Sequence, residues 1–193
     1  NTDAILETEV RPQQSRSEDS VVEGILSLHL KKKLFASFEE QQGYLTAASI
    51  ASYVSLNKLD QRQRYRASID LVSTKNTEFN FSKGSSSSGL GYALTLFQSW
   101  WEQVLSKPGQ FTHPIFATGE ILTSGDLKPI NHVVDKINAA CAYVEENTDT
   151  ITKFYICYPR ENDDEIETSL RERVSRLGGV LLPASRLQSL LGE

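Results

Sequence analysis

The sequence predicts an α+β domain of mixed α/β character, in which N-terminal strands and a hairpin precede alternating helices and short strands. Two observations carry this prediction. The first half of the chain contains short runs in which apolar and polar residues alternate, as they do in half-buried strands. The second half alternates between apolar β-type runs and segments with apolar residues at helical spacing. A chain of 193 residues is long enough for one domain with a sizeable core.

The composition is that of an ordinary globular domain, with 39% hydrophobic and 23% charged residues. A net charge of −5 argues against a broad nucleic-acid surface. No stretch approaches the roughly 18 apolar residues that a membrane-spanning helix needs, so we expect a soluble, cytoplasmic protein without membrane partners. Cys141 and Cys157 lie in no metal-binding spacing, and no metal is expected. Because the chain begins at Asn1 and contains no methionine, we expect it to be a piece of a longer protein.

The N-terminal third is predicted to consist of an arm followed by strands. Residues 1–20 are polar and aperiodic, which is typical of an arm or linker, so the domain is expected to span residues 21–193. Two apolar runs that flank three consecutive lysines predict a β-hairpin over residues 21–40. Clean alternation predicts further strands at 65–74 and 77–81.

The remaining elements alternate between helix and strand. Leu90, Ala93, Leu94 and Phe97 recur at the spacing of one buried helical face, which predicts a helix over residues 89–105. Short strands are expected on both sides of the turn at residues 124–126. The later elements are predicted as a helix at 131–144, a strand at 152–159, a helix at 161–177, a strand at 178–184 and a closing helix at 185–191.

The run of four serines at residues 85–88 has three interpretations. A flexible linker is disfavoured because apolar segments lie on both sides of it. A phosphate-binding loop agrees with the G-x-x-x-x-G spacing from Gly84 to Gly89, but Leu90 and Gly91 follow where such a loop needs Lys and Ser or Thr. The third interpretation is a nucleophile turn, in which backbone N–H groups at a helix start stabilise an oxyanion.

A serine nucleophile needs a base, and histidine is the first candidate. His29, His113 and His132 show no order with a carboxylate that would indicate a Ser-His-Asp triad. Lys136 lies at the margin of an apolar stripe on the predicted helix 131–144, where burial would favour its neutral form. The alternative is that the Lys136 stem covers apolar surface while its amine stays in water.

Several ordered segments resemble the proteolytic domain of Lon proteases. They are "SSGLGYALTLF", a Ser-x-Gly turn that opens a helix, then "FATGEILTSGDLKPI", then "HVVDKINAAC" with a lysine before paired alanines. The resemblance continues through "TKFYICYPREND" and "GGVLLPASRLQSLL", and so covers residues 80–193. It implies a Lon-type fold and a serine endopeptidase that uses a Ser-Lys dyad.

The resemblance also implies roles for particular residues. Ser87, which one residue separates from Gly89, corresponds to the nucleophile, and Lys136 corresponds to the general base. Thr118 corresponds to the threonine whose hydroxyl helps to hold the lysine amine. This chain has Gly-Ser-Ser ahead of the serine where the family has an acidic residue, Gly and Pro, so Ser86 and Ser88 remain alternative nucleophiles.

The family resemblance further implies polypeptide substrates and a homo-oligomeric ring. Most members carry an ATPase module, and this chain has no Walker motif, so ATP is a cofactor only if an ATPase lies elsewhere. An ATPase-free relative, such as a viral processing protease, is the alternative. A second alternative is a non-proteolytic assembly module of the same fold.

Overall fold

Three apolar β-type runs in the C-terminal half form one parallel sheet. In the computed structural model, which describes residues 4–12, 26–30, 65–73, 86–103, 112–122 and 124–191, their order is β4-β7-β8. The strands are β4 (Ile115–Ala117), β7 (Phe154–Pro159) and β8 (Gly179–Ala184). The central strand β7 is buried at five of its six positions, which explains why its sequence is apolar almost without interruption.

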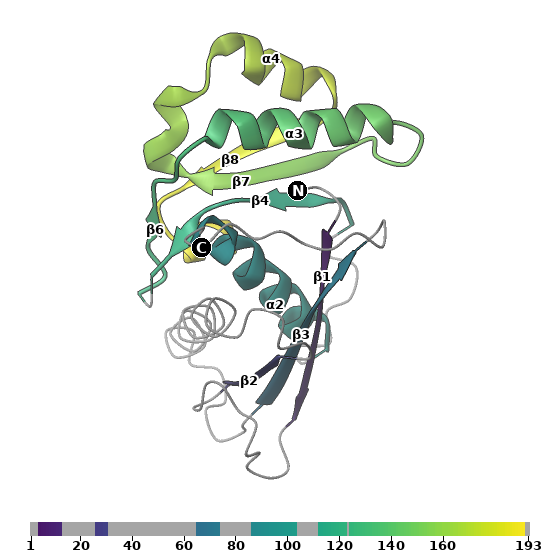
Figure 1. Cartoon of the computed structure of the whole chain (residues 1–193), viewed down its shortest axis with the longest axis vertical. Coiled ribbons are helices and arrows are strands. Elements are labelled where there is room, and N and C mark those ends of the chain that lie inside the picture. Colours follow the sequence, from purple (N-terminus) through teal and green to yellow (C-terminus); the bar gives the residue numbers. More distant parts are fainter. Residues whose placement is uncertain are drawn as a thin grey trace.

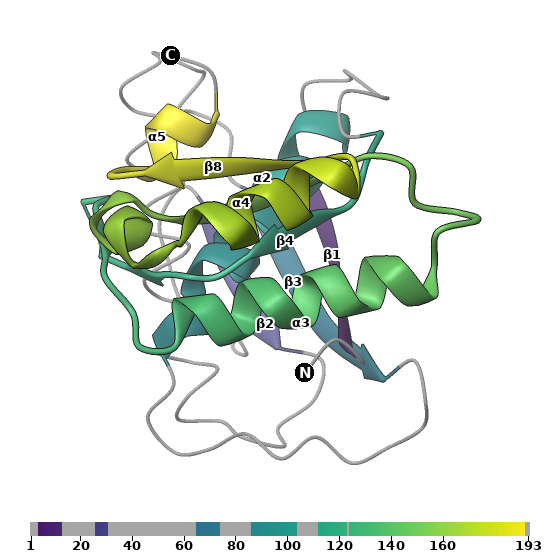
Figure 2. The same ribbon diagram turned by 90° about the horizontal axis from the view of Figure 1, so that it is seen from above.

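Helices cover both faces of this sheet (Figures 1 and 2). α3 (Val133–Glu146) and α4 (Thr168–Arg176) lie on one face, and α2 (Gly89–Gln103) lies on the other. The connections from β4 to β7 and from β7 to β8 pass through α3 and α4, and right-handed crossovers in one direction place both helices on the same face. Two apolar cores result, one under α3 and α4 and one under the start of α2.

A second sheet lies beyond α2. Its strands are β1 (Ala4–Pro12), β3 (Tyr65–Ser73) and β2 (Leu26–Leu30), in that spatial order. β1 pairs antiparallel with β3, and β2 pairs parallel with it. β1 lies against α2 (Figure 1). The expected N-terminal arm therefore contains a strand, whose nine residues all pair with β3.

The strand predicted at 65–74 and the helix predicted at 89–105 are confirmed as β3 and α2. Of the hairpin predicted over residues 21–40, only its first strand falls on described residues, as β2. The second strand of that hairpin, and the strand predicted at 77–81, lie outside the described residues.

A small hairpin follows β4 and is fastened to the C-terminal segment. β5 (Glu120–Ile121) and β6 (Leu127–Lys128) pair antiparallel around Gly125, whose φ of 86° requires a residue without a side chain. Leu127 N–H donates to the Ser185 carbonyl, and Leu187 N–H donates to the Gly125 carbonyl. The closing helix predicted at 185–191 is confirmed as the four-residue α5 (Leu187–Leu190).

The helix predicted at 161–177 is broken into two pieces. A 3₁₀ segment, η2 (Arg160–Glu165), is separated from α4 by two extended residues, Ile166 at φ −94° and ψ 104° and Glu167 at φ −64° and ψ 154°. Ile166 buries its side chain in the core under α3 and α4. Arg171 Nε donates to the Ile166 carbonyl at 3.1 Å, so a side chain occupies an acceptor that a continuous helix would have used.

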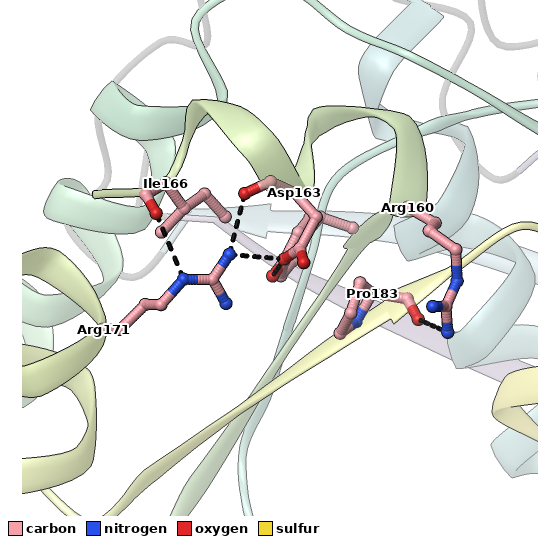
Figure 3. Close-up of polar contacts among 6 residues, drawn as sticks. Arg160, Asp163, Ile166, Arg171 and Pro183 are labelled. Carbon is pink, nitrogen blue, oxygen red and sulfur yellow. Dashed lines mark hydrogen bonds and ion pairs between the residues drawn. The ribbon is translucent and has the colours of Figure 1, made fainter. Parts of the chain in front are cut away.

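A polar network holds η2 against β7 and α4 (Figure 3). Tyr158 Oη donates to Asp163 Oδ1 at 2.6 Å, and Arg171 Nη2 donates to the same oxygen at 2.8 Å and to the Asp163 carbonyl at 2.7 Å. The hydrogen bond from Tyr158, followed by the Arg171 contacts, holds the pKa of Asp163 below its ordinary value. Burial, then the neighbouring carboxylate, raises the pKa of Tyr158. The Asp163 carboxylate is thus a structural group of the fold.

We expect Gly178→Ala to lower the free energy of unfolding by about 2–4 kcal/mol. Gly178 ends α4 at φ 81°, and a Cβ atom there would lie 2.3 Å from the Thr152 carbonyl oxygen. Urea denaturation at pH 7 measures the change. The control, Ser175→Ala, replaces an exposed residue of α4 and should change the free energy by less than about 0.5 kcal/mol. Equal effects of the two substitutions would contradict this account.

Asp163→Asn should lower the free energy of unfolding at pH 7 by about 1 kcal/mol, because charge-assisted bonds are lost at a partly exposed site. The native pKa is depressed, so the carboxylate contributes fully above its ordinary pKa of about 3.9 and loses its contribution as pH falls through the native value. The difference between the variant and the wild type should therefore disappear in strong acid. Asp164→Asn, an exposed neighbour on η2, is the matched control. A difference that stays constant as the pH falls below about 4 would refute the assignment.

Candidate functional site

Several segments converge at the edge where the parallel strands end. Thr118 and Gly119 directly follow β4, and Pro159 ends β7. Thr118 N–H donates to the Cys157 carbonyl at 3.0 Å, which keeps the chain beside β7 after β4 has ended. In open sheets with parallel strands, ligands bind outside the carboxyl ends of the strands. This edge is therefore the expected position of a ligand site.

The serine turn is held at this edge by Gly119. Gly119 N–H donates to the Ser87 carbonyl at 2.7 Å, and its own carbonyl accepts from Leu90 N–H at 3.0 Å. A Cβ atom on Gly119 would lie 3.3 Å from Pro159 Cγ and 3.4 Å from Leu90 Cβ, so the close approach favours glycine. These reciprocal bonds enclose the junction between the 3₁₀ turn η1 (Ser86–Ser88) and α2.

The candidate serines differ in their surroundings. Ser87 is half-buried, whereas Ser88 Oγ is enclosed and has no hydrogen-bond partner within the described part of the chain. An enclosed hydroxyl cannot meet a substrate without a rearrangement of the turn. Ser85 and the side chain of Ser86 lie outside the described residues. Of the two serines with described side chains, the enclosed position of the Ser88 hydroxyl therefore disfavours Ser88, and Ser87 is kept as the candidate nucleophile.

Thr118 contacts the serine turn directly. Its hydroxyl donates to the Ser87 carbonyl at 3.3 Å, next to the Gly119 N–H that binds the same oxygen. We expected this hydroxyl to hold the amine of Lys136. Donation to a carbonyl leaves the lone pairs of the hydroxyl able to accept from an amine. The expected role of Thr118 stays a prediction.

Lys136 lies in the first turn of α3, on the opposite face of the sheet from α2 (Figure 1). The apolar stripe expected on this helix is confirmed, since its buried residues are Val133, Ile137, Ala140, Cys141 and Val144. Lys136 is at the margin of the stripe and half-buried, and this burial lowers its pKa. The Lys136 amine makes no ion pair with any described residue. The site therefore offers a lysine that gives up its proton more readily than an exposed lysine does.

The start of α3 is unusual in its backbone. His132, the N-cap residue, is in the left-handed region at φ 60° and ψ 37°, where residues other than glycine are uncommon. Its ring lies 3.4 Å from Asp135 Oδ2, and both side chains are more than three-quarters exposed. This exposed pair is on the solvent side of the helix, so neither group replaces Lys136 as a buried base.

Asn162 is a buried polar residue at the same edge for which the sequence alone indicated no role. It is 1% exposed, and its Oδ1 accepts from Ile130 N–H at 3.0 Å. Its Nδ2 donates to the Ile130 carbonyl at 2.9 Å and to Glu165 Oε1 at 2.5 Å. The Pro159-x-x-Asn162 spacing was visible in the sequence, but the partner Ile130 lies 32 residues earlier and only folding brings the two together.

No group of three or more His, Cys, Asp or Glu side chains that could hold a metal ion exists within the described residues. Both cysteines are buried free thiols, and burial raises the pKa of Cys157 to about 12. No helix in the described ranges combines the length and the apolar character needed to span a membrane. No protein-family model matches the chain, and no curated protein matches it either.

Ser88→Ala should raise the free energy of unfolding by about 1 kcal/mol, because the substitution removes a buried hydroxyl that lacks a partner. Thermal and urea denaturation measure the change. Ser124→Ala is an informative comparison because the Ser124 hydroxyl donates to Asp126 at 2.6 Å in an exposed position. That substitution should leave stability unchanged or slightly lower it. A destabilised Ser88→Ala protein would mean that the Ser88 hydroxyl has a partner.

Proposed function

We propose that this chain is a Lon-type serine endopeptidase that hydrolyses peptide bonds with Ser87 as nucleophile and Lys136 as general base. One observation carries the proposal: a half-buried lysine with a lowered pKa lies in the first turn of α3, the helix that follows the β5-β6 hairpin, and Gly119 holds the serine turn at the start of α2 against the carboxyl end of β4. Burial of a lysine favours the neutral amine, which is the form that can accept a proton from a serine hydroxyl.

The reaction proceeds through an acyl-enzyme. The neutral Lys136 amine takes the proton of Ser87 Oγ as this oxygen attacks the peptide carbonyl, and the resulting ammonium gives a proton to the leaving amine. An ester between Ser87 and the acyl half of the substrate remains. Lys136 then takes a proton from a water molecule that attacks the ester, which releases the carboxylic acid and restores the serine. The positive end of α2 favours the negative charge that develops on the carbonyl oxygen.

Thr118 supports this pair in the proposal. Its hydroxyl already bonds the Ser87 carbonyl and can accept from the lysine amine at the same time. The proposed substrates are polypeptides, and the proposed assembly is a homo-oligomeric ring. An ATPase module on another part of the protein, or on a partner, would deliver the substrates, as the resemblance to Lon proteases implies.

Ser87→Ala and Lys136→Ala should each lower kcat/KM for a fluorescent casein by at least about 100-fold, because each removes a group that takes part in proton transfer or bond formation. Ser88→Ala is the matched control and should keep wild-type turnover, since the Ser88 hydroxyl is enclosed. The wild-type kcat/KM should rise with pH through the pKa of Lys136, with a midpoint below the ordinary lysine value of 10.5.

Two results would count against the proposal in different ways. Wild-type turnover in both Ser87→Ala and Lys136→Ala would show that the dyad is wrongly assigned. No hydrolysis by the wild type, with or without an added ATPase partner, would favour a non-proteolytic assembly module of this fold.

A further inference from the structure

We propose that Asn162 is a positioning residue that fixes Lys136 at the depth where it can act on Ser87. This inference rests on the proposed function, because it assigns Lys136 the role of the base. It goes beyond that function by naming a residue that touches neither the substrate nor the dyad in the proposed mechanism.

The first step is the geometry of the contact between Asn162 and Ile130. One side-chain amide binds both backbone groups of Ile130, at 3.0 Å to its N–H and at 2.9 Å to its carbonyl. This is the pattern by which a neighbouring strand would pair with that residue. Ile130 is 8% exposed and Asn162 1% exposed, so water does not compete for these bonds. The segment that leads into α3 is therefore held by a buried two-point contact.

The second step is the distance along the chain from this contact to the lysine. Ile130 is followed by Asn131 and by His132 in the left-handed region, and the His132 carbonyl accepts from Lys136 N–H at 3.2 Å. The link between Ile130 and Lys136 is thus one turn with a strained residue followed by the first turn of a helix. This link is short and its backbone conformation is restricted, so a shift of Ile130 along the helix axis should move Lys136 by a similar amount.

The third step separates this contact from the general stability of η2. The Asp163 network already fastens η2 to β7 through Tyr158 and to α4 through Arg171. The bonds of Asn162 go to the segment before α3. Within the described residues, these side-chain bonds are what connects η2 to the segment leading into α3.

Packing alone does not set the axial position of α3. Its stripe of small and β-branched residues, Val133, Ile137, Ala140, Cys141 and Val144, buries one side of the helix but makes no directional bond along its axis. A fixed register needs directional contacts. Arg173 of α4 supplies some by donating to Asn138 and Glu145 of α3, and the paired hydrogen bonds of Asn162 supply one just before the first turn, at the end that carries the lysine. Loss of that contact should let the first turn move outward and expose the Lys136 amine to water.

The charged groups around Lys136 do not explain its lowered pKa. Burial is the cause of its lowered pKa, and no described charged group contributes. On the same stretch of chain, the side chains of His132 and Asp135 are exposed and lie 3.4 Å from each other. Glu165, which binds Asn162, is exposed on η2. The pKa of Lys136 is therefore a measure of how deeply its amine is buried, which is the quantity that Asn162 is proposed to control.

The experiment compares Asn162→Ala and Asn162→Leu with Asp163→Asn in the full chain. Asn162→Leu removes both hydrogen bonds to Ile130, adds no charge and is close to asparagine in size and branching, so it avoids the cavity that alanine would leave. Asp163→Asn is the matched control: it lies on the same 3₁₀ turn and weakens η2 without touching Ile130.

Two readouts are combined. Kinetics on the fluorescent casein should show kcat lowered by about 10- to 100-fold in both Asn162 variants, with KM changed by less than about twofold, because misplacement of the base affects chemistry and not substrate binding. Trace acetylation of Lys136, followed by mass spectrometry across pH, should give a midpoint that rises toward 10.5 in both variants. Asp163→Asn should leave kcat and the midpoint at their wild-type values.

The acetylation readout does not depend on protease activity, which keeps the two proposals distinguishable. An unchanged Lys136 midpoint in both folded Asn162 variants overturns the positioning role, whatever happens to turnover. An equal shift in Asp163→Asn overturns it as well, since the effect would then be one of general loosening. If Lys136→Ala keeps full activity, the dyad fails, while the midpoint in the Asn162 variants still decides whether Asn162 positions this lysine.

Discussion

The position of the serine turn beside the parallel sheet depends on the reciprocal backbone hydrogen bonds of Gly119. One residue with no side chain ties the turn before α2 to the segment that leaves β4, and Thr118 N–H ties the same segment to β7. α2 and the parallel sheet are thereby joined at the carboxyl edge as well as through their apolar core. Larger residues do not fit between Pro159 and Leu90 without displacing one of them. This close approach adds a directional backbone contact to the apolar packing that holds the serine turn near the strands.

Several locally unfavourable features occur around this edge. His132 adopts left-handed backbone angles, Lys136 is half-buried, and Ser88 Oγ is enclosed without a partner among the described residues. The Gln188 amide, buried against Gly125 at the adjacent hairpin, also lacks a described partner. Each feature costs stability, and local rules tend to be broken where a site is shaped for function. These four features therefore accompany the edge at which the proposed site lies.

The serine turn and Lys136 belong to helices on opposite faces of the sheet, and this placement follows from the sheet topology. Parallel strands end at one edge, so helices from opposite faces begin or pass close to the same place although their cores are separate. α2 contributes the serine turn from one face, and α3 contributes the lysine from the other (Figure 1). In the proposed dyad, the two residues would meet at this edge without either helix crossing the core. Polar contacts such as that between Asn162 and Ile130 then hold the segments that lead into these helices.

Periodicity and apolar runs were sufficient to predict most elements, because burial of one face imposes a pattern that is local in sequence. The α3 stripe, the strand β7 and the order of elements from α2 to α5 follow from that pattern. The break at Ile166 did not follow from it, because it depends on where Arg171 and Asp163 meet after folding. The spatial order of β1, β3 and β2, and the contact of Asn162 with Ile130, equally needed the tertiary structure.

The sequence by itself determined which residues could do chemistry and which faces are buried, since both are properties of side chains at short range. Only the tertiary structure decided that Ser87 is half-buried, Ser88 enclosed and Lys136 lowered in pKa, because burial is a property of packing between distant segments.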